Sequence, residues 1–72
     1  MRIVLNGEFR EVPEACSVTA LLTQLQIPSD RVAVEVNLNI VDRRAFDGTD
    51  LRDGDRVEVI GFIGGGKEIG HE

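Results

Sequence analysis

Three consecutive glycines, at residues 64–66, are the first candidates for chemistry in this sequence. They follow the apolar run "RVEVIGFI" and precede the mostly polar residues "KEIGHE". Gly61, Gly66 and Lys67 match G-x-x-x-x-G-K, the start of a phosphate-binding loop. Glu68, however, stands where that motif needs Ser or Thr to hold magnesium. We therefore reject a phosphate loop, and the glycines need another explanation.

The one cysteine and the one histidine are the next candidates. Cys16 precedes a predicted helix, and a helix N-terminus can lower the pKa of a thiol. We nevertheless favour a small apolar residue packed before the helix. His71 lies in the polar tail and is interpreted as a solvated residue. One cysteine and one distant histidine do not supply the roughly four ligands of a zinc site, and one cysteine forms no internal disulfide. We expect no metal and no bound cofactor.

Acidic and basic clusters have simpler interpretations as turns. Asp53 and Asp55 flank Gly54, a combination typical of turns. Together with Asp50 they could bind a cation, but a calcium loop needs more ligands at defined spacing. The pair Arg43 and Arg44 is interpreted as a solvated turn rather than an anion site.

Charge and hydropathy exclude two classes of partner. The 72 residues hold 13 acids and 8 bases, a formal net charge of −5. An acidic domain repels phosphate backbones, so we expect no nucleic acid partner. No run approaches the roughly 20 apolar residues of a membrane span, and the N-terminus lacks the apolar region of a signal peptide. We expect a soluble, cytoplasmic protein that has no membrane as a partner.

The first half of the chain predicts a hairpin and a helix. Residues 2–5 and 8–12 are predicted strands, joined by Asn6-Gly7, a pair that favours a type I′ turn. Ser17 is expected to cap a helix that ends before Pro28. The helix has one apolar stripe at helical spacing, made of Val18, Leu21, Leu22 and Leu25.

The second half predicts three strands and a polar connection. Alternating valines indicate strands at residues 31–37 and 56–63, and a short strand is expected around Ile40. Phe46 and Leu51 are the apolar anchors of the connection. The element order indicates an α+β domain in which one main helix packs on a mixed sheet. We expect the first and last strands to be neighbours at its centre.

Five segments together resemble one known family. "IVLNGE", "SVTALLTQL", "VAVEVN", "LRDGDRVEVI" and "FIGGG" occur in the order and at the spacing of the thiamine-biosynthesis sulfur carrier family. The resemblance covers residues 1–66 and implies a ubiquitin-like β-grasp fold. Molybdopterin-synthase small subunits share the fold and the ending.

The resemblance implies a carrier protein rather than an enzyme. An E1-like adenylating enzyme would activate the carboxylate of Gly66, sulfur would replace AMP, and the thiocarboxylate would donate sulfur to thiazole synthase. Gly64 and Gly65 would form a flexible arm, since glycine has no Cβ to shield the carbonyl or restrict φ. Phe62 would be an exposed anchor for a partner, or alternatively a residue that closes the core.

The chain departs from the family after Gly66, where residues 67–72 follow. While Gly66 is amide-bonded to Lys67 it has no carboxylate to adenylate. Either a processing protease removes the extension, or the protein carries no sulfur. A carrier for molybdopterin, cysteine or a secondary metabolite, and a β-grasp interaction module without sulfur chemistry, remain alternatives. We divide the chain into a β-grasp domain at residues 1–63 and a mobile arm with its extension at residues 64–72.

Overall fold

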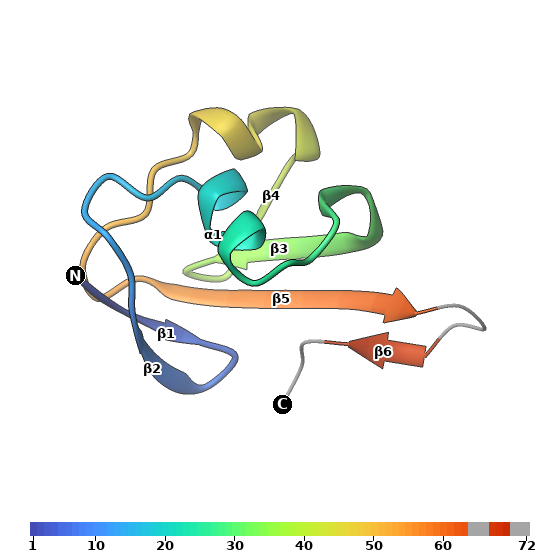
Figure 1. Ribbon diagram of the computed structural model, residues 1–72, viewed down its shortest axis with the longest axis horizontal. Helices are drawn as coiled ribbons and strands as arrows, with labels where there is room; N and C mark the ends of the chain where they lie inside the picture. The colour runs from blue at the N-terminus through green and yellow to red at the C-terminus, as the bar shows by residue number, and fades with distance from the viewer. Residues whose placement is uncertain (64–66, 70–72) are drawn as a thin grey trace.

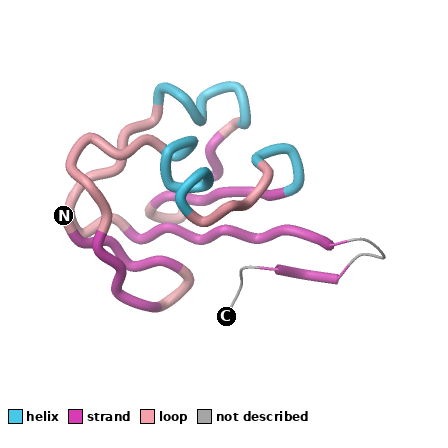
Figure 2. Tube along the Cα trace, in the orientation of Figure 1, coloured by secondary structure: helices cyan, strands magenta, loops and turns pink. Residues whose placement is uncertain are grey.

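Six strands of the described chain form one mixed sheet, with the helical segments gathered on one side of it (Figures 1 and 2). The computed structural model describes the backbone of residues 1–63 and 67–69. Side chains are described for residues 1–61 only. The strands are β1 (Arg2–Leu5), β2 (Glu8–Glu11), β3 (Val32–Val36), β4 (Asn39–Val41), β5 (Arg56–Ile63) and β6 (Lys67–Ile69). The helices are α1 (Val18–Gln24) and the 3₁₀ helices η1 (Ser29–Arg31) and η2 (Arg43–Gly48).

The hairpin between β1 and β2 forms as predicted. Asn6 has a φ of 49° and Gly7 a φ of 86°, the positive values that a type I′ turn requires at both central residues. β1 and β2 pair antiparallel, with Val4 opposite Phe9. The second strand ends at Glu11, one residue earlier than predicted.

Helix α1 begins and packs as the apolar stripe predicts. The Ser17 hydroxyl oxygen accepts a hydrogen bond from the Ala20 backbone N–H at 3.0 Å, which satisfies one donor of the first turn. Leu21 and Leu22 are buried, and Leu25 at the C-cap packs against the core while half-buried. A helix of seven residues is not stable alone in water. Its packing on the sheet must therefore hold it in place.

The core lies between the sheet and the helical segments. Its buried members are Ile3, Val12, Cys16, Val18, Leu21, Leu22, Val32, Val34, Phe46, Leu51, Val57 and Val59. The predicted anchors of the polar connection, Phe46 and Leu51, are both buried, at 3% and 4% exposure. The connection also contains η2, which the sequence did not predict.

Strand β5 is the centre of the sheet. The strand order is β2-β1-β5-β3-β4, with β6 also paired to β5. β5 runs parallel to β1, where Leu5 pairs with Val57, and antiparallel to β3 along Val32–Val36. The first strand and the strand before the glycines are therefore central neighbours, as predicted. One main helix on a mixed sheet confirms the α+β fold class.

The extension differs from the sequence prediction. Residues 64–72 were expected to be a mobile arm with its extension, whereas Lys67–Ile69 form β6, antiparallel to β5, with Phe62 opposite Glu68. The physical reason is that β1 pairs with only the beginning of β5, which leaves backbone groups further along that edge for another strand. Residues 64–66 and 70–72 lie outside the described part of the chain, and the division at residue 63 stays a prediction.

None of the described helices is long and apolar enough to cross a lipid bilayer.

Candidate functional site

The candidate site is the end of β5, because this strand leads directly into the glycines. Val57, Val59 and Gly61 are buried, so every second residue of β5 from Val57 to Gly61 is fixed in the interior. β3 pairs with β5 from Val57 through Gly61. The strand thus provides a rigid base for whatever follows Ile63.

Asn6 extends the support of β5 beyond the end of β1. Its side-chain oxygen accepts from the Val59 N–H at 2.8 Å, and its side-chain NH₂ donates to the Val59 carbonyl oxygen at 3.3 Å. The amide therefore pairs with β5 as a strand residue would. Sequence reasoning used Asn6 only as a turn residue, because a contact 53 positions away has no local signal.

The predicted site residues lie at the end of the described part of β5 or outside the described residues. The backbone of Phe62 is in β5, and its side chain is outside the described set. Gly64, Gly65 and Gly66, which the sequence predicts to be the arm and the sulfur-carrying residue, are outside it, as is His71. Their roles therefore remain proposals.

The sheet face opposite α1 carries exposed apolar side chains that sequence reasoning missed. Phe9 is 73% exposed and Ile40 is 76% exposed. Register places Phe9 beside Val4, and Ile40 beside Glu35. The Arg2 guanidinium lies 5.2 Å from the centroid of the Phe9 ring, a cation–π contact. The alternation of β3 gave a signal for this face, since it placed Ala33 and Glu35 away from the valines.

The turn between β3 and β4 is strained and contains no glycine. Asn37 has a φ of 52° and Leu38 a φ of 72°, and leucine seldom adopts a positive φ. The Asn37 side chain offsets part of the strain, because its oxygen accepts from the Arg56 N–H at 3.0 Å and its NH₂ donates to the Asp55 carboxylate at 2.9 Å. Leu38 itself is 88% exposed.

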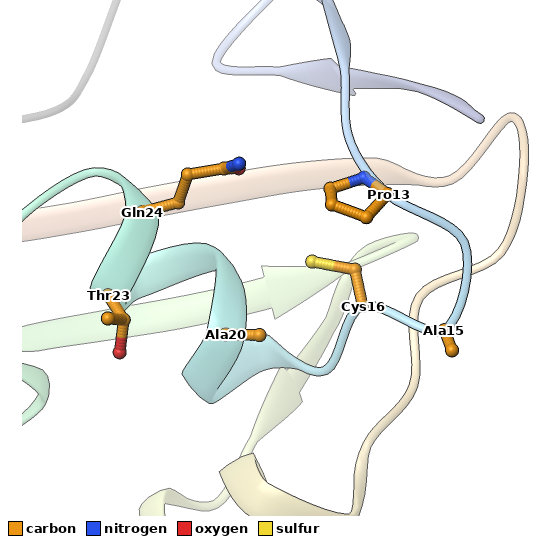
Figure 3. Close-up of a pocket in the computed structure, with 6 residues that line it drawn as sticks. All are labelled: Pro13, Ala15, Cys16, Ala20, Thr23 and Gln24. Atoms are coloured by element: carbon orange, nitrogen blue, oxygen red, sulfur yellow. The ribbon is translucent and has the colours of Figure 1, made fainter.

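Cys16 lies beside a hollow between the segment before α1 and the helix itself. Its sulfur points into the space between Pro13 and the helix residues Ala20 and Gln24 (Figure 3). The residue is only 3% exposed, and burial raises the pKa of the Cys16 thiol. A buried thiol with a raised pKa is a poor nucleophile at neutral pH. The geometry therefore favours the packed apolar residue over a reactive thiol.

Asp53 and Asp55 lie in the turn around Gly54, as predicted, and the Asp55 carboxylate bonds within this turn, whereas the Asp53 carboxylate bonds to β1. The Asp53 carboxylate accepts from the Arg2 N–H at 2.8 Å, and the Asp55 carboxylate accepts from the Arg52 N–H at 2.8 Å. Asp50 is exposed and forms an isolated bridge with Ser17. In the part of the chain that the structure describes, no three His, Cys, Asp or Glu residues are grouped to hold a metal ion.

Both arginines of the pair donate hydrogen bonds to oxygen atoms of this chain. Arg43 donates to the Ser29 carbonyl oxygen at 3.1 Å, and Arg44 donates to the Asp42 carboxylate at 3.2 Å. The hydrogen bonds from Arg44 lower the pKa of Asp42. These contacts favour the turn interpretation over an anion site.

Fold and site geometry together define a ubiquitin-like β-grasp domain, in which a central strand runs from the sheet into a glycine segment. The chain belongs to the ThiS family, whose model matches residues 3–66. The match ends at Gly66 and leaves residues 67–72 beyond it.

Solved structures and curated relatives agree with this placement. The crystal structure of the thiamine biosynthesis protein ThiS from Geobacter metallireducens is 40% identical, covers 92% of this chain and 100% of its own, and superposes with a TM-score of 0.79.

Two curated relatives differ in how much of their own length the match to this chain covers. A thiazole synthase from Paramagnetospirillum magneticum is 43% identical over 68 residues, which are 94% of this chain and 21% of that protein. The chain thus spans about a fifth of the thiazole synthase that it matches. An uncharacterized protein, ycf40, from Porphyra purpurea is 39% identical over 64 residues, which are 89% of this chain and 90% of the relative.

Proposed function

We propose that the protein is a sulfur carrier for the synthesis of the thiamine thiazole ring. The observation that carries the proposal is the family match from Ile3 to Gly66, on a fold whose central strand leads into the glycines. Two relatives named thiazole synthase contain a stretch similar to this chain, which supports thiazole synthase as the acceptor of the sulfur. The chain would act in the cytoplasm as a co-substrate rather than as a catalyst.

Gly66 is the proposed sulfur-carrying residue. An E1-like enzyme would transfer AMP from ATP to the Gly66 carboxylate and release pyrophosphate, and a sulfur nucleophile would then displace AMP to leave a thiocarboxylate. Attack at the activated carbonyl needs open access, which glycine allows because it has no Cβ. Gly64 and Gly65 would let the carboxylate reach an enclosed active site without a fixed shape.

Removal of residues 67–72 by a processing protease is part of the proposal, since Gly66 has no free carboxylate before the cut. We expect the protein isolated from its own cells to end at Gly66, with an intact mass of either the carboxylate or the heavier thiocarboxylate. Mass spectrometry of the whole protein, without digestion, measures this. Recovery of only uncut protein under thiamine starvation would contradict the proposal.

Phe62 is the proposed contact for the E1-like enzyme. Phe62 follows Glu58 and Ile60 at every second position of β5, and these positions alternate with the buried ones. The enzyme would therefore bind the sheet face away from α1. An arm of glycines is too featureless to select a partner, and aromatic anchors dominate many interfaces. Phe62→Ala is expected to weaken binding about tenfold, as judged by titration calorimetry on chains that end at Gly66.

The control is Thr23→Ala, because Thr23 is exposed on α1, on the other side of the sheet from the face proposed to contact the enzyme. It should leave the affinity for the enzyme unchanged. If Phe62 instead closes the core, Phe62→Ala should lower the free energy of unfolding by about 3–5 kcal/mol. That result, seen in urea unfolding, would show that the contact assignment is wrong.

A further inference from the structure

On the edge of β5 that faces β1, every second residue presents its backbone N–H and carbonyl groups. Val59 offers both its N–H and its carbonyl to Asn6 on this edge. Because consecutive strand residues turn their backbone groups to opposite sides, Val57, Gly61 and Ile63 face the same edge. Residue 56 faces the other way, which agrees with the Asn37 N–H donating to the Arg56 carbonyl at 2.7 Å on the β3 side.

Two partners, Asn6 and then β6, occupy this edge in succession. At Val57 the carbonyl accepts from the Asn6 backbone N–H at 2.9 Å. At Val59 the side-chain amide of Asn6 takes over. At Gly61 and Ile63 the partners are residues of β6, with Gly61 opposite Ile69 and Ile63 opposite Lys67. Figure 1 shows β6 alongside the far part of β5, separate from the β1–β2 hairpin.

β6 must lie on the β1 side, because Gly61 pairs with Val32 of β3 and also with Ile69 of β6. One residue can have strand neighbours only on its two opposite edges. Without β6, the backbone groups of Gly61 and Ile63 on this edge would be open. Such an open edge is a template for an added strand from another protein.

We propose that β6 is an autoinhibitory strand, which occupies the β5 edge that the E1-like enzyme needs when it docks. This inference rests on the proposed function. An enzyme that takes up the residues after Ile63 must approach the end of β5, where β6 now lies. The extension thus hinders docking by pairing with β5, and not only by blocking the Gly66 carboxylate.

The inhibition is expected to be modest. β6 has three residues, so its pairing is weak and a fraction of molecules has the edge free. The apparent dissociation constant is the intrinsic one divided by that fraction. Releasing β6 should therefore tighten docking by about three- to tenfold.

Proline substitutions in the uncut chain test the pairing without removing any residue. By the same alternation, Lys67 and Ile69 turn their N–H groups toward β5, whereas Glu68 turns its N–H away. Ile69→Pro removes a donor that faces Gly61, and Glu68→Pro is the matched control, since proline is tolerated where the N–H faces solvent. Ile69→Pro should speed hydrogen exchange of the Gly61 amide by about three- to tenfold, and Glu68→Pro should not.

Docking is then measured with the same uncut proteins and the E1-like enzyme by surface plasmon resonance. Ile69→Pro should bind about three- to tenfold more tightly than the parent, with Glu68→Pro equal to the parent. Equal affinity of all three, or equal exchange at Gly61, would overturn the autoinhibition. A chain that ends at Gly66 separates the two hypotheses. If it binds while Ile69→Pro shows no gain, only the autoinhibition fails, and if it does not bind, the proposed function and the autoinhibition fail together.

Discussion

A variant that ends at Gly66 is expected to gain sulfur at its C-terminus, whereas the 72-residue chain is expected to gain none. Incubated with the E1-like enzyme, ATP and sulfide, the shortened protein should become heavier by about 16 Da, as sulfur replaces oxygen in an activated acyl group. The uncut chain keeps Gly66 in an amide bond, so it offers the enzyme no carboxylate at that position. Mass spectrometry of both intact proteins measures the difference.

The first step of the reaction has its own readout. Adenylation releases pyrophosphate reversibly, so the variant that ends at Gly66 should support exchange of labelled pyrophosphate into ATP. A variant that ends at Gly65 tests position, because its carboxylate stops one residue short, roughly 3.3–3.6 Å of extended chain. It should lose both exchange and sulfur gain. Efficient adenylation of the uncut chain at Glu72 would contradict the role of Gly66.

The elements with local signals could be predicted from the sequence. Asn6-Gly7 sets the hairpin because the turn type needs positive φ at both residues, and the φ values of 49° and 86° agree. Ser17 caps α1 because a hydroxyl satisfies a free N–H of the first turn. These features depend on a few adjacent residues, so the sequence alone carries them.

The features that depend on distant partners could not be predicted. Leu38 adopts a positive φ although glycine or asparagine is the usual residue there, and the Asn37 contacts with Asp55 and Arg56 explain how the turn is held. β6 forms because the far edge of β5 is left open by the short β1, which is a property of the sheet rather than of residues 67–69. The candidate site was predicted from the glycines, but its support by the side chain of Asn6 was not.

The Leu22→Ala substitution in α1 is expected to lower the free energy of unfolding by about 2–5 kcal/mol. Leu22 is 1% exposed and belongs to the core cluster, so the substitution removes buried methyl groups and leaves a cavity. The loss is a large part of the roughly 3–5 kcal/mol that one core supplies to so small a domain. Urea unfolding at 25 °C measures it.

Thr23→Ala is the matched control, because Thr23 is exposed in the same helix and exposed substitutions usually change stability by less than about 0.5 kcal/mol. Helix propensity cannot cause a loss in either variant, because alanine is the best helix former, so a comparable loss for both would contradict the assignment of the loss to the burial of Leu22. The predicted contrast follows from the length of α1. Seven residues are too few to be helical alone in water, so α1 exists because Leu22 and its neighbours bury their side chains on the sheet. A Leu22→Ala protein as stable as the parent would show that the helix does not depend on this packing.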